Sequence, residues 1–195
     1  PARAALGAAL LWLGGRAAVR AADWRDDASY YRAAVACNPV SAKARGGLGL
    51  ALLRAGRTAE GESALQEAVS LNPALFDPAM NLALLSYERG NLAEARARLE
   101  RALALSPDAP DGLTLKALLD ERDGDWAGAA AALSRAVAVR PDDFVARFDL
   151  ARALAALGRR EEAAAQLDAC LRLAPDDAGR EDARRMREGL ARGNK

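Results

Sequence analysis

Histidine is absent from this chain of 195 residues, and the chain contains only 2 cysteines and 2 methionines. Without histidine, the commonest general base and a frequent metal ligand are both missing. The chain also lacks a glycine-rich phosphate-binding loop and a G-x-S-x-G nucleophile elbow. We therefore expect that this segment is not an enzyme, that it has no catalytic residue, and that it uses no cofactor.

An excess of one charge is also lacking. Lysine and arginine together number 28, against 27 aspartates and glutamates, which gives a net charge of +1. A chain this balanced has no broad electrostatic attraction for a polyanion, so nucleic acid is not an expected partner. The C-terminal tail carries a mild local excess of arginine, for which a solvated terminal helix is the favoured interpretation.

Aromatic residues make up only 5% of the chain although 51% is hydrophobic, which predicts a core of small side chains. Alanine, leucine, arginine and glutamate dominate the composition, and β-branched residues are few. No segment alternates apolar and polar residues for long, as a half-buried strand would. The composition therefore predicts an all-α protein.

A repeat with a period of 34 residues organises the chain. Prolines recur at 39, 73, 107, 141 and 175, and glycines recur at 56, 90, 124 and 158, each seventeen residues before a proline. A glycine suits a helix C-terminus that needs a left-handed residue, and a proline cannot continue a helix. Each unit is therefore predicted to be a helix, a turn, a second helix and a stop.

Columns of equivalent residues show which face of the second helix is buried. Two columns hold small residues, which allow helices to approach closely, and a third holds large apolar residues three positions before one of them. The small columns are Ala34, Ala68, Ala102, Ala136 and Cys170, and Gly61, Ala95, Ala129 and Ala163; the large column is Tyr31, Leu65, Leu99, Leu133 and Leu167.

The repeat resembles the tetratricopeptide repeat family, whose pattern is W-x-x-L-G-x-x-Y…A-x-x-x-F…P over 34 residues. The stretch "GLGLALLRAGRTAEGESALQEAVSLNP" (47–73) fits that pattern well. The resemblance implies a right-handed α-solenoid of five helix pairs at about 8–41, 42–75, 76–109, 110–143 and 144–177. A polar capping helix and tail would follow over 178–195, as the exposed end of a solenoid requires.

The fourth copy departs from the pattern. Lys116 and Asp120 stand where other copies have leucines such as Leu150 and Leu154. We expect its first helix to rotate or pack less deeply, and to be the least stable part of the chain. The segment "DERDGDW" (120–126) is rich in oxygen ligands but lacks the full calcium-loop pattern, so no metal site is expected there.

The stretch "AADWRDDASYYRAAVACNPVSAK" (21–43) concentrates aromatic and acidic residues. Repeat architecture explains most of it, because Trp24 corresponds to Leu92 and Trp126, and Asp23 corresponds to the predicted N-caps Asn91 and Asp125. Asp26 and Asp27 are adjacent on one helix and so do not face each other. The two cysteines, Cys37 and Cys170, lie too many helical layers apart for a disulfide, and both are expected to be buried.

The N-terminal run "AALGAALLWLGG" (4–15) is apolar but shorter than the roughly 20 residues that a membrane span needs. Two interpretations stay open: the first solenoid helix, or the end of a longer span that attaches the chain to a membrane through residues N-terminal to 16. The absence of an initiator methionine, with Pro1 first, suits a fragment or a processed product.

A second resemblance covers the junction that follows. Asp23, Trp24, Asp27, Cys37, Pro39, Ala42 and Lys43 are similar to the membrane-to-repeat junction of the transmembrane and tetratricopeptide-repeat O-mannosyltransferase family and its bacterial relatives. Asp27 replaces a Glu and Ser41 an Asn of that pattern, and the catalytic acids of that family lie upstream of such a segment. The resemblance implies the extracytoplasmic repeat domain of a membrane glycosyltransferase that uses polyprenyl-phosphate sugars.

The family resemblance also implies a concave groove lined by the first helix of each pair. The middle of this groove is apolar and cations lie near both ends, which suits an extended peptide with central apolar anchors. The alternative is that its apolar members only pack between neighbouring first helices. The groove residues are Lys43, Leu50, Arg54, Met80, Asn81, Leu84, Tyr87, Thr114, Leu118, Glu121, Phe148 and Arg152.

Two functions therefore remain open. The chain is either the repeat domain of a membrane glycosyltransferase, presenting an acceptor protein on the extracytoplasmic side, or a free-standing adaptor, for which a cytoplasmic location is the alternative. In both cases the expected partner is a protein or peptide.

Overall fold

The computed structural model describes residues 27–174 and 176–192. These residues form ten helices and no strand. The chain divides into two compact units, residues 1–85 and 86–195, and the division falls inside one helix, after Leu85. The apolar run 4–15, together with Asp23 and Trp24, lies outside the described residues.

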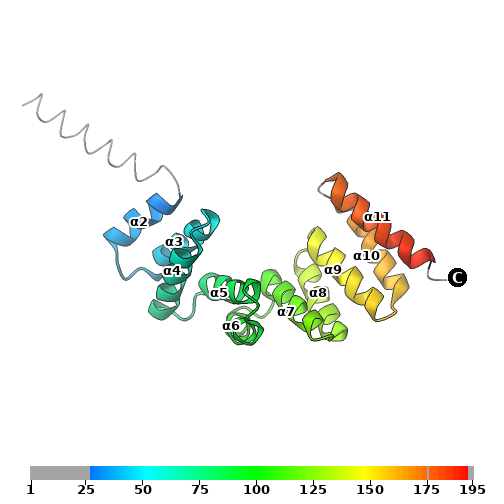
Figure 1. The fold of residues 1–195 in the computed structure, drawn as a ribbon, viewed down its shortest axis with the longest axis horizontal. Helices are drawn as coiled ribbons and strands as arrows, with labels where there is room; N and C mark the ends of the chain where they lie inside the picture. The colour runs from blue at the N-terminus through cyan, green and yellow to red at the C-terminus, as the bar shows by residue number, and fades with distance from the viewer. Residues whose placement is uncertain (1–26, 175, 193–195) are drawn as a thin grey trace, which may run out of the picture. The chain divides into compact units, whose positions relative to one another are not determined.

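The helices follow the 34-residue period closely (Figure 1). The first helices of four successive pairs begin at residues 42, 76, 110 and 144, and the second helices begin at 58, 92, 126 and 160. The helices are α2 (Asp27–Cys37), α3 (Ala42–Arg54), α4 (Thr58–Leu71), α5 (Phe76–Glu88), α6 (Leu92–Leu105), α7 (Pro110–Arg122), α8 (Trp126–Val139), α9 (Phe144–Ala156), α10 (Arg160–Leu173) and α11 (Asp177–Arg192).

Glycine and proline end these helices as the repeat predicts. The turn within each pair contains a glycine in the left-handed region, with φ of 74° at Gly56 and Gly158 and 78° at Gly90 and Gly124. A side chain with Cβ is strained at these φ values, which explains why glycine recurs there. Each of α4, α6 and α8 ends two residues before a proline of the 34-residue series.

Unit 1 consists of α2, α3, α4 and most of α5, and α3 packs against both α2 and α4. Its core is built from alanine and leucine, including Ala51, Leu52 and Leu65. The backbones of α3 and α4 approach closely, since a Cβ on Gly61 would lie 2.9 Å from the carbonyl oxygen of Gly49. The small residue at position 61 thus has the packing role that its column predicts.

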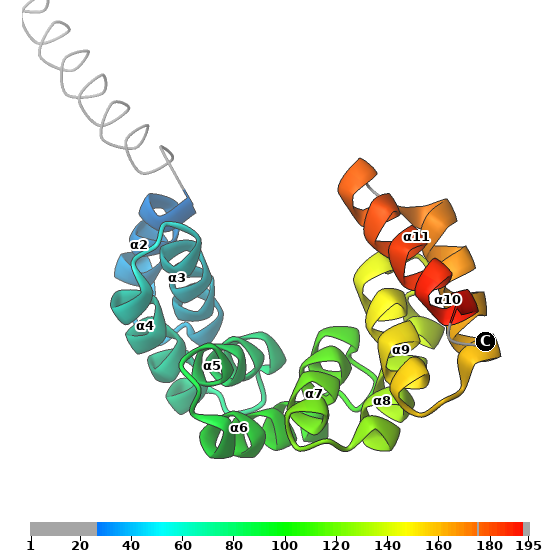
Figure 2. The same cartoon turned by 45° about the vertical axis from the view of Figure 1, so that its right-hand side comes forward.

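Unit 2 stacks its helices in chain order, with α8 packed on both α7 and α9, and α10 packed on α9 and α11 (Figure 2). Leu99, Leu133 and Leu167 of the large apolar column are at most 3% exposed. The small residues beside them, Ala102, Ala136 and Cys170, are 0% exposed. Ala183 of α11 is also fully buried, so that this polar helix covers the last pair.

The sequence predicts that the fourth first helix rotates or packs less deeply, but three of its leucines are fully buried. In α7, Leu113, Leu115 and Leu119 are each at most 2% exposed, and even Asp120 is only 6% exposed. Asp120 tolerates burial because the ammonium of Lys116, one turn earlier, lies 2.6 Å from it. The ion pair replaces two leucines, and Leu113, Leu115 and Leu119 of α7 stay buried.

Two smaller expectations also need correction. Asp125 caps α8 by accepting a hydrogen bond from the backbone N–H of Gly128, whereas the Asn91 side chain makes no capping hydrogen bond to α6. Cys170 is buried as expected, but Cys37 is exposed because it ends α2 at the surface. Both thiols are free.

Candidate functional site

The predicted groove residues lie on the first helices α3, α5, α7 and α9, and they fall into two sets because the chain forms two units. Unit 1 holds Lys43, Leu50, Arg54, Met80, Asn81 and Leu84; unit 2 holds Tyr87, Thr114, Leu118, Glu121, Phe148 and Arg152. We describe each set within its own unit.

Unit 1 contains a cavity of about 290 Å³ that three of the predicted residues line. Lys43 and Leu50 come from α3, and Asn81 comes from α5. The remaining lining residues are Tyr31, Gly46, Gly47, Leu65, Leu75, Asp77 and Pro78. The cavity therefore lies where α2, α3 and the N-terminal half of α5 meet.

Two glycines shape this cavity. A Cβ on Gly47 would lie 2.2 Å from Cε1 of Tyr31, so only glycine lets the tyrosine ring lie directly on α3. A Cβ on Gly46 would lie 2.9 Å from Cγ of Pro78 on α5. Because neither glycine has a side chain, the wall of the cavity is backbone, framed by the tyrosine ring and the proline ring.

Polar groups without a fixed partner stand at this cavity. Among the described residues, the ammonium of Lys43 and the carboxylate of Asp77 make no hydrogen bond or ion pair. Asn81 donates from Nδ2 to the Asp77 carbonyl oxygen at 2.8 Å, which orients its amide. The cavity thus combines an apolar interior with one cation, one anion and one amide able to bond a ligand.

The other predicted residues of unit 1 lie outside this cavity. Arg54 is exposed and lies 3.9 Å from Asp27. Leu84 is 37% exposed, whereas Met80 is only 8% exposed. Met80 is therefore a core residue and presents almost no surface to a ligand.

In unit 2, Arg152 does not offer a free cation. Its guanidinium lies 2.7 Å from Oε2 of Glu121 and 3.1 Å from Oδ1 of Asp149. Burial raises the pKa of both carboxyl groups, although the charge of Arg152 opposes the shift. Two carboxylates of the chain thus already neutralise Arg152, one of the cations expected near the ends of the groove.

The rest of the unit 2 set is engaged within the fold. The Tyr87 ring lies beneath the Arg122 guanidinium, 5.6 Å from its carbon, and the Thr114 hydroxyl donates to the Pro110 carbonyl oxygen. Phe148 stacks on Phe144 with ring centroids 6.0 Å apart and packs against the core around Cys170. Leu118 is half-buried. Phe148 thus packs against its own helix and against the core around Cys170.

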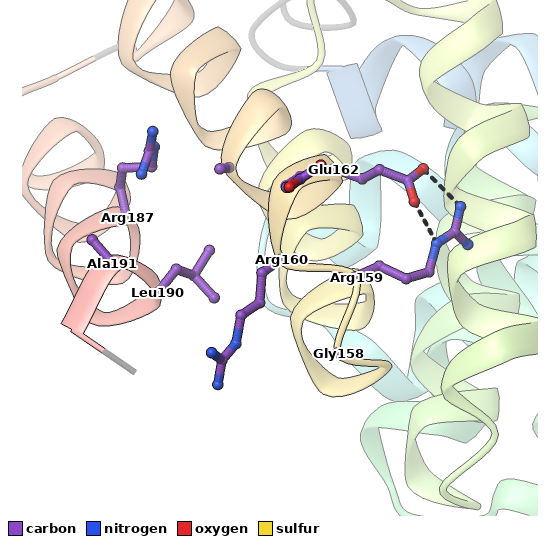
Figure 3. A pocket seen from close by; sticks show the side chains of 9 residues that line it. Gly158, Arg159, Arg160, Glu162, Arg187, Leu190 and Ala191 are labelled. Carbon is purple, nitrogen blue, oxygen red and sulfur yellow. Dashed lines mark hydrogen bonds and ion pairs between the residues drawn. The ribbon is translucent and has the colours of Figure 1, made fainter. Parts of the chain in front are cut away.

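A larger and more open cavity, of about 560 Å³, lies between the start of α10 and the end of α11 (Figure 3). Arg159 forms a paired contact with Glu162, with both nitrogen–oxygen distances at 2.7 Å. Arg187 reaches Asp168 at 3.1 Å. With these arginines already paired, the cavity does not present the unpaired cations that an anion site would need.

Sequence analysis missed Tyr31 and Asp77 as lining residues of the unit 1 cavity. Tyr31 belongs to a column that is otherwise leucine and fully buried, so the pattern assigned it to the core. The signal that could have revealed it is the pair Gly46-Gly47, which leaves room on α3 for a neighbouring ring. Nothing in the sequence marked Asp77 as a lining residue, because surface aspartates are common in the first turn of a helix.

No group of three or more histidine, cysteine, aspartate or glutamate side chains is placed to hold a metal ion among the residues that the structure describes. Within the same residues, no helix has both the length and the apolar character needed to cross a membrane.

The helix pairs, their glycine turns and the small-residue columns define a class of protein, the α-solenoid built from helix-turn-helix repeats. Models of the tetratricopeptide repeat match residues 13–76, 52–119 and 122–183. The chain belongs to the tetratricopeptide repeat family. No curated protein matches it.

Solved structures with the same fold are numerous. One is YrrB, described as a TPR protein with an unusual peptide-binding site: it is 20% identical, with a TM-score of 0.72 over 86% of this chain and 84% of that one. MamA is 20% identical, with a TM-score of 0.62 over 73% of this chain and 84% of its own. A thermophilic TPR protein of Thermus thermophilus is 24% identical, with a TM-score of 0.62 over 95% of both chains. At these identities the likeness concerns the fold.

Proposed function

We propose that this chain is a protein interaction module that binds a peptide segment of a partner at the unit 1 cavity. The observation that carries the proposal is an apolar cavity of about 290 Å³ lined by Lys43 and Asp77, whose charged groups have no partner among the described residues. A cavity of this size accommodates one large apolar side chain of a peptide. The fold is shared with YrrB, which is described as having a peptide-binding site.

The polar groups suit a peptide backbone. The Lys43 ammonium donates hydrogen bonds, so it would meet a peptide carbonyl or a carboxylate of the ligand. The Asp77 carboxylate accepts, so it would meet a peptide N–H. Asn81 uses one N–H within the chain, which leaves its Oδ1 as a further acceptor. An apolar side chain of the peptide in the cavity would supply affinity. Hydrogen bonds to the peptide backbone on either side of it would fix which peptide residue enters the cavity.

A selection from a random peptide library tests this proposal. We expect that peptides selected on the natural chain share one large apolar residue, and that Leu50→Glu weakens their binding at least 10-fold by placing a charge in the cavity. Lys43→Ala and Asn81→Ala should weaken binding less, because they remove single hydrogen bonds. Circular dichroism verifies that each variant is folded.

Val40→Ala is the matched control, since Val40 is 73% exposed in the same unit and does not line the cavity. Its binding should equal that of the natural chain. The proposal is wrong if the selected peptides bind the Leu50→Glu and Val40→Ala variants equally well while both remain folded.

Attachment to a membrane glycosyltransferase is a finer hypothesis that rests only on the junction resemblance at residues 20–43. None of the matches reported above is described as a glycosyltransferase. The gene sequence upstream of Pro1 tests it directly. Several hydrophobic spans there would support the hypothesis, and their absence would favour the free-standing adaptor.

A further inference from the structure

A second cavity, of about 350 Å³, lies in unit 2 between α6 and α7. Its apolar part is formed by Leu99, Leu103 and Ala104 of α6 and by Leu119 of α7. Four charged residues complete the lining, namely Arg96, Glu100, Lys116 and Asp120. This cavity does not include any residue of the unit 1 cavity, so an inference about it stands apart from the function proposed above.

The interface between α8 and α9 in the same unit is equivalent to the α6/α7 interface but lacks these charges. The equivalent positions 34 residues later, on α8 and α9, hold Ala130 in place of Arg96, Leu150 in place of Lys116 and Leu154 in place of Asp120. Those three equivalents are 3%, 3% and 4% exposed and belong to one apolar cluster. A closed interface is therefore available to this fold, and the α6/α7 interface is open because its residues differ.

The charged residues hold one another in place. Asp120 receives a hydrogen bond from Lys116 Nζ at 2.6 Å, and its Oδ1 lies 3.6 Å from Arg96 Nη1. Arg96 also donates to the Leu119 carbonyl oxygen at 2.8 Å and to the Asp123 carboxylate.

This arrangement has a cost that leucines would avoid. Burying an ion pair costs desolvation free energy that a well-packed leucine pair does not, so these residues are not the most stable solution for the interface. They do keep a cavity open and its charged walls fixed. A fixed and open cavity is what a binding site requires.

The carboxylate of Glu100 determines which ligand charge suits this cavity. Lys116 and Arg96 are both paired to carboxylates of the chain, whereas Glu100 makes no hydrogen bond or ion pair within the described residues. Among the described residues, the lining charge without a partner in the chain is therefore the exposed carboxylate of Glu100, which lies near Leu103 and Ala104. A ligand that complements both features is apolar at one point and cationic at the next.

We propose that the α6/α7 cavity is a second docking site, which binds a partner-protein segment presenting a leucine-sized side chain next to a lysine or arginine. The apolar side chain contacts the half-buried Leu103 and the exposed Ala104. The neighbouring cation pairs with the Glu100 carboxylate. The site would let one chain hold two different segments, one in each unit.

Three capped dipeptides test the proposal on the full chain: N-acetyl-Leu-Lys-amide, the charge-reversed N-acetyl-Leu-Glu-amide and the truncated N-acetyl-Ala-Lys-amide. The readout is the methyl NMR spectrum, with assigned signals of Leu99, Leu103 and Leu119. We expect saturable shifts of these methyl signals with Leu-Lys, and at least 10-fold weaker binding of the other two. Shifts that are equal for Leu-Lys and Leu-Glu, or that fall on other methyl groups, would overturn the proposal.

Three variants make the test specific. Glu100→Lys should reverse the preference toward Leu-Glu, while Glu161→Lys, which changes an exposed carboxylate on α10, should leave it unchanged. Lys116→Leu combined with Asp120→Leu should fill the cavity, as the α8/α9 interface does, and abolish the shifts while the helices remain formed. Leu-Lys binding that survives this double substitution shows that the cavity is not the site.

Discussion

The guanidinium of Arg152 on α9 lies 2.7 Å from Oε2 of Glu121 on α7, and this ion pair joins two successive first helices of unit 2. The other oxygen of Glu121, Oε1, is buried and has no hydrogen-bond partner. Asp149, one turn before Arg152, is only 9% exposed and competes for the same cation. One arginine thus serves two partly desolvated carboxylates, and this arrangement has consequences for stability.

The first prediction concerns the pH dependence of that stability. Burial raises the pKa of Glu121 and of Asp149, and the charge of Asp143 adds to the shift of Asp149. A raised pKa means that the folded chain binds protons more tightly than the unfolded chain. The free energy of folding gained from this tighter proton binding is fully present below the ordinary carboxyl pKa. It is lost as pH rises through the raised pKa. Glu121→Gln with Asp149→Asn should therefore gain stability relative to the natural chain as pH rises from the ordinary carboxyl pKa, about 4, toward neutral.

Urea unfolding at several pH values measures this difference. Glu162→Gln is the control with the opposite sign, because the hydrogen bond from Arg159 lowers the pKa of Glu162. In the natural chain, ionised Glu162 stabilises the fold above the ordinary carboxyl pKa, and this stabilisation is lost as pH falls. Glu162→Gln lacks the carboxylate, so it should lose stability relative to the natural chain as pH rises. A difference between the double variant and the natural chain that is flat over this range would contradict the assignment.

The second prediction concerns the contact between Gly47 and Tyr31. Gly47→Ala would place a Cβ 2.2 Å from the Tyr31 ring, so we expect a loss of roughly 1–3 kcal/mol of unfolding free energy from overpacking. Combining it with Tyr31→Ala should recover part of that loss, since the ring is gone. Gly189→Ala, on a helix position with no atom within 4 Å of the added Cβ, should instead be neutral or stabilising. Thermal unfolding of Gly47→Ala, Tyr31→Ala, the double variant and Gly189→Ala measures these effects. If the losses of the two single variants simply add in the double variant, the contact is refuted.

The third prediction tests the small-residue column. Ala136 is fully buried on α8, so Ala136→Leu should cost roughly 1–3 kcal/mol of stability, and Ala102→Leu should behave alike. Ala138→Leu, two residues along the same helix on its exposed face, should change stability by less than about 0.5 kcal/mol. Equal unfolding midpoints for Ala136→Leu and Ala138→Leu would mean that the buried face of α8 is assigned wrongly.

The fourth prediction separates the two thiols. Burial raises the pKa of Cys170 from 9.0 to about 11, whereas Cys37 is exposed at the end of α2. The thiolate is the reactive species, so the raised pKa and the burial of Cys170 both slow its reaction. Labelling with a chromogenic disulfide should show one fast and one slow thiol, and Cys37→Ser should remove the fast phase. Two fast phases in the folded chain would contradict the burial of Cys170.

The sequence by itself determined the repeat, the helices and the buried face of each second helix. The reason is that these features depend on local rules, namely a 34-residue period, left-handed glycines at 56, 90, 124 and 158, and small residues at fixed positions. The family resemblance placed Lys43, Leu50 and Asn81 in a groove, and these three residues line the unit 1 cavity.

Only the tertiary structure decided which charges are satisfied and which cavities are open. The sequence placed Arg152 at the end of a groove and Asp120 at a leucine position, but it could not name their partners. The partners of a long side chain depend on which helix comes within a few ångströms of it. In the fold, Glu121 and Asp149 occupy Arg152, and Lys116 with Arg96 makes Asp120 part of a cavity wall. Tyr31 likewise entered the candidate site because Gly47, on a neighbouring helix, leaves room for its ring.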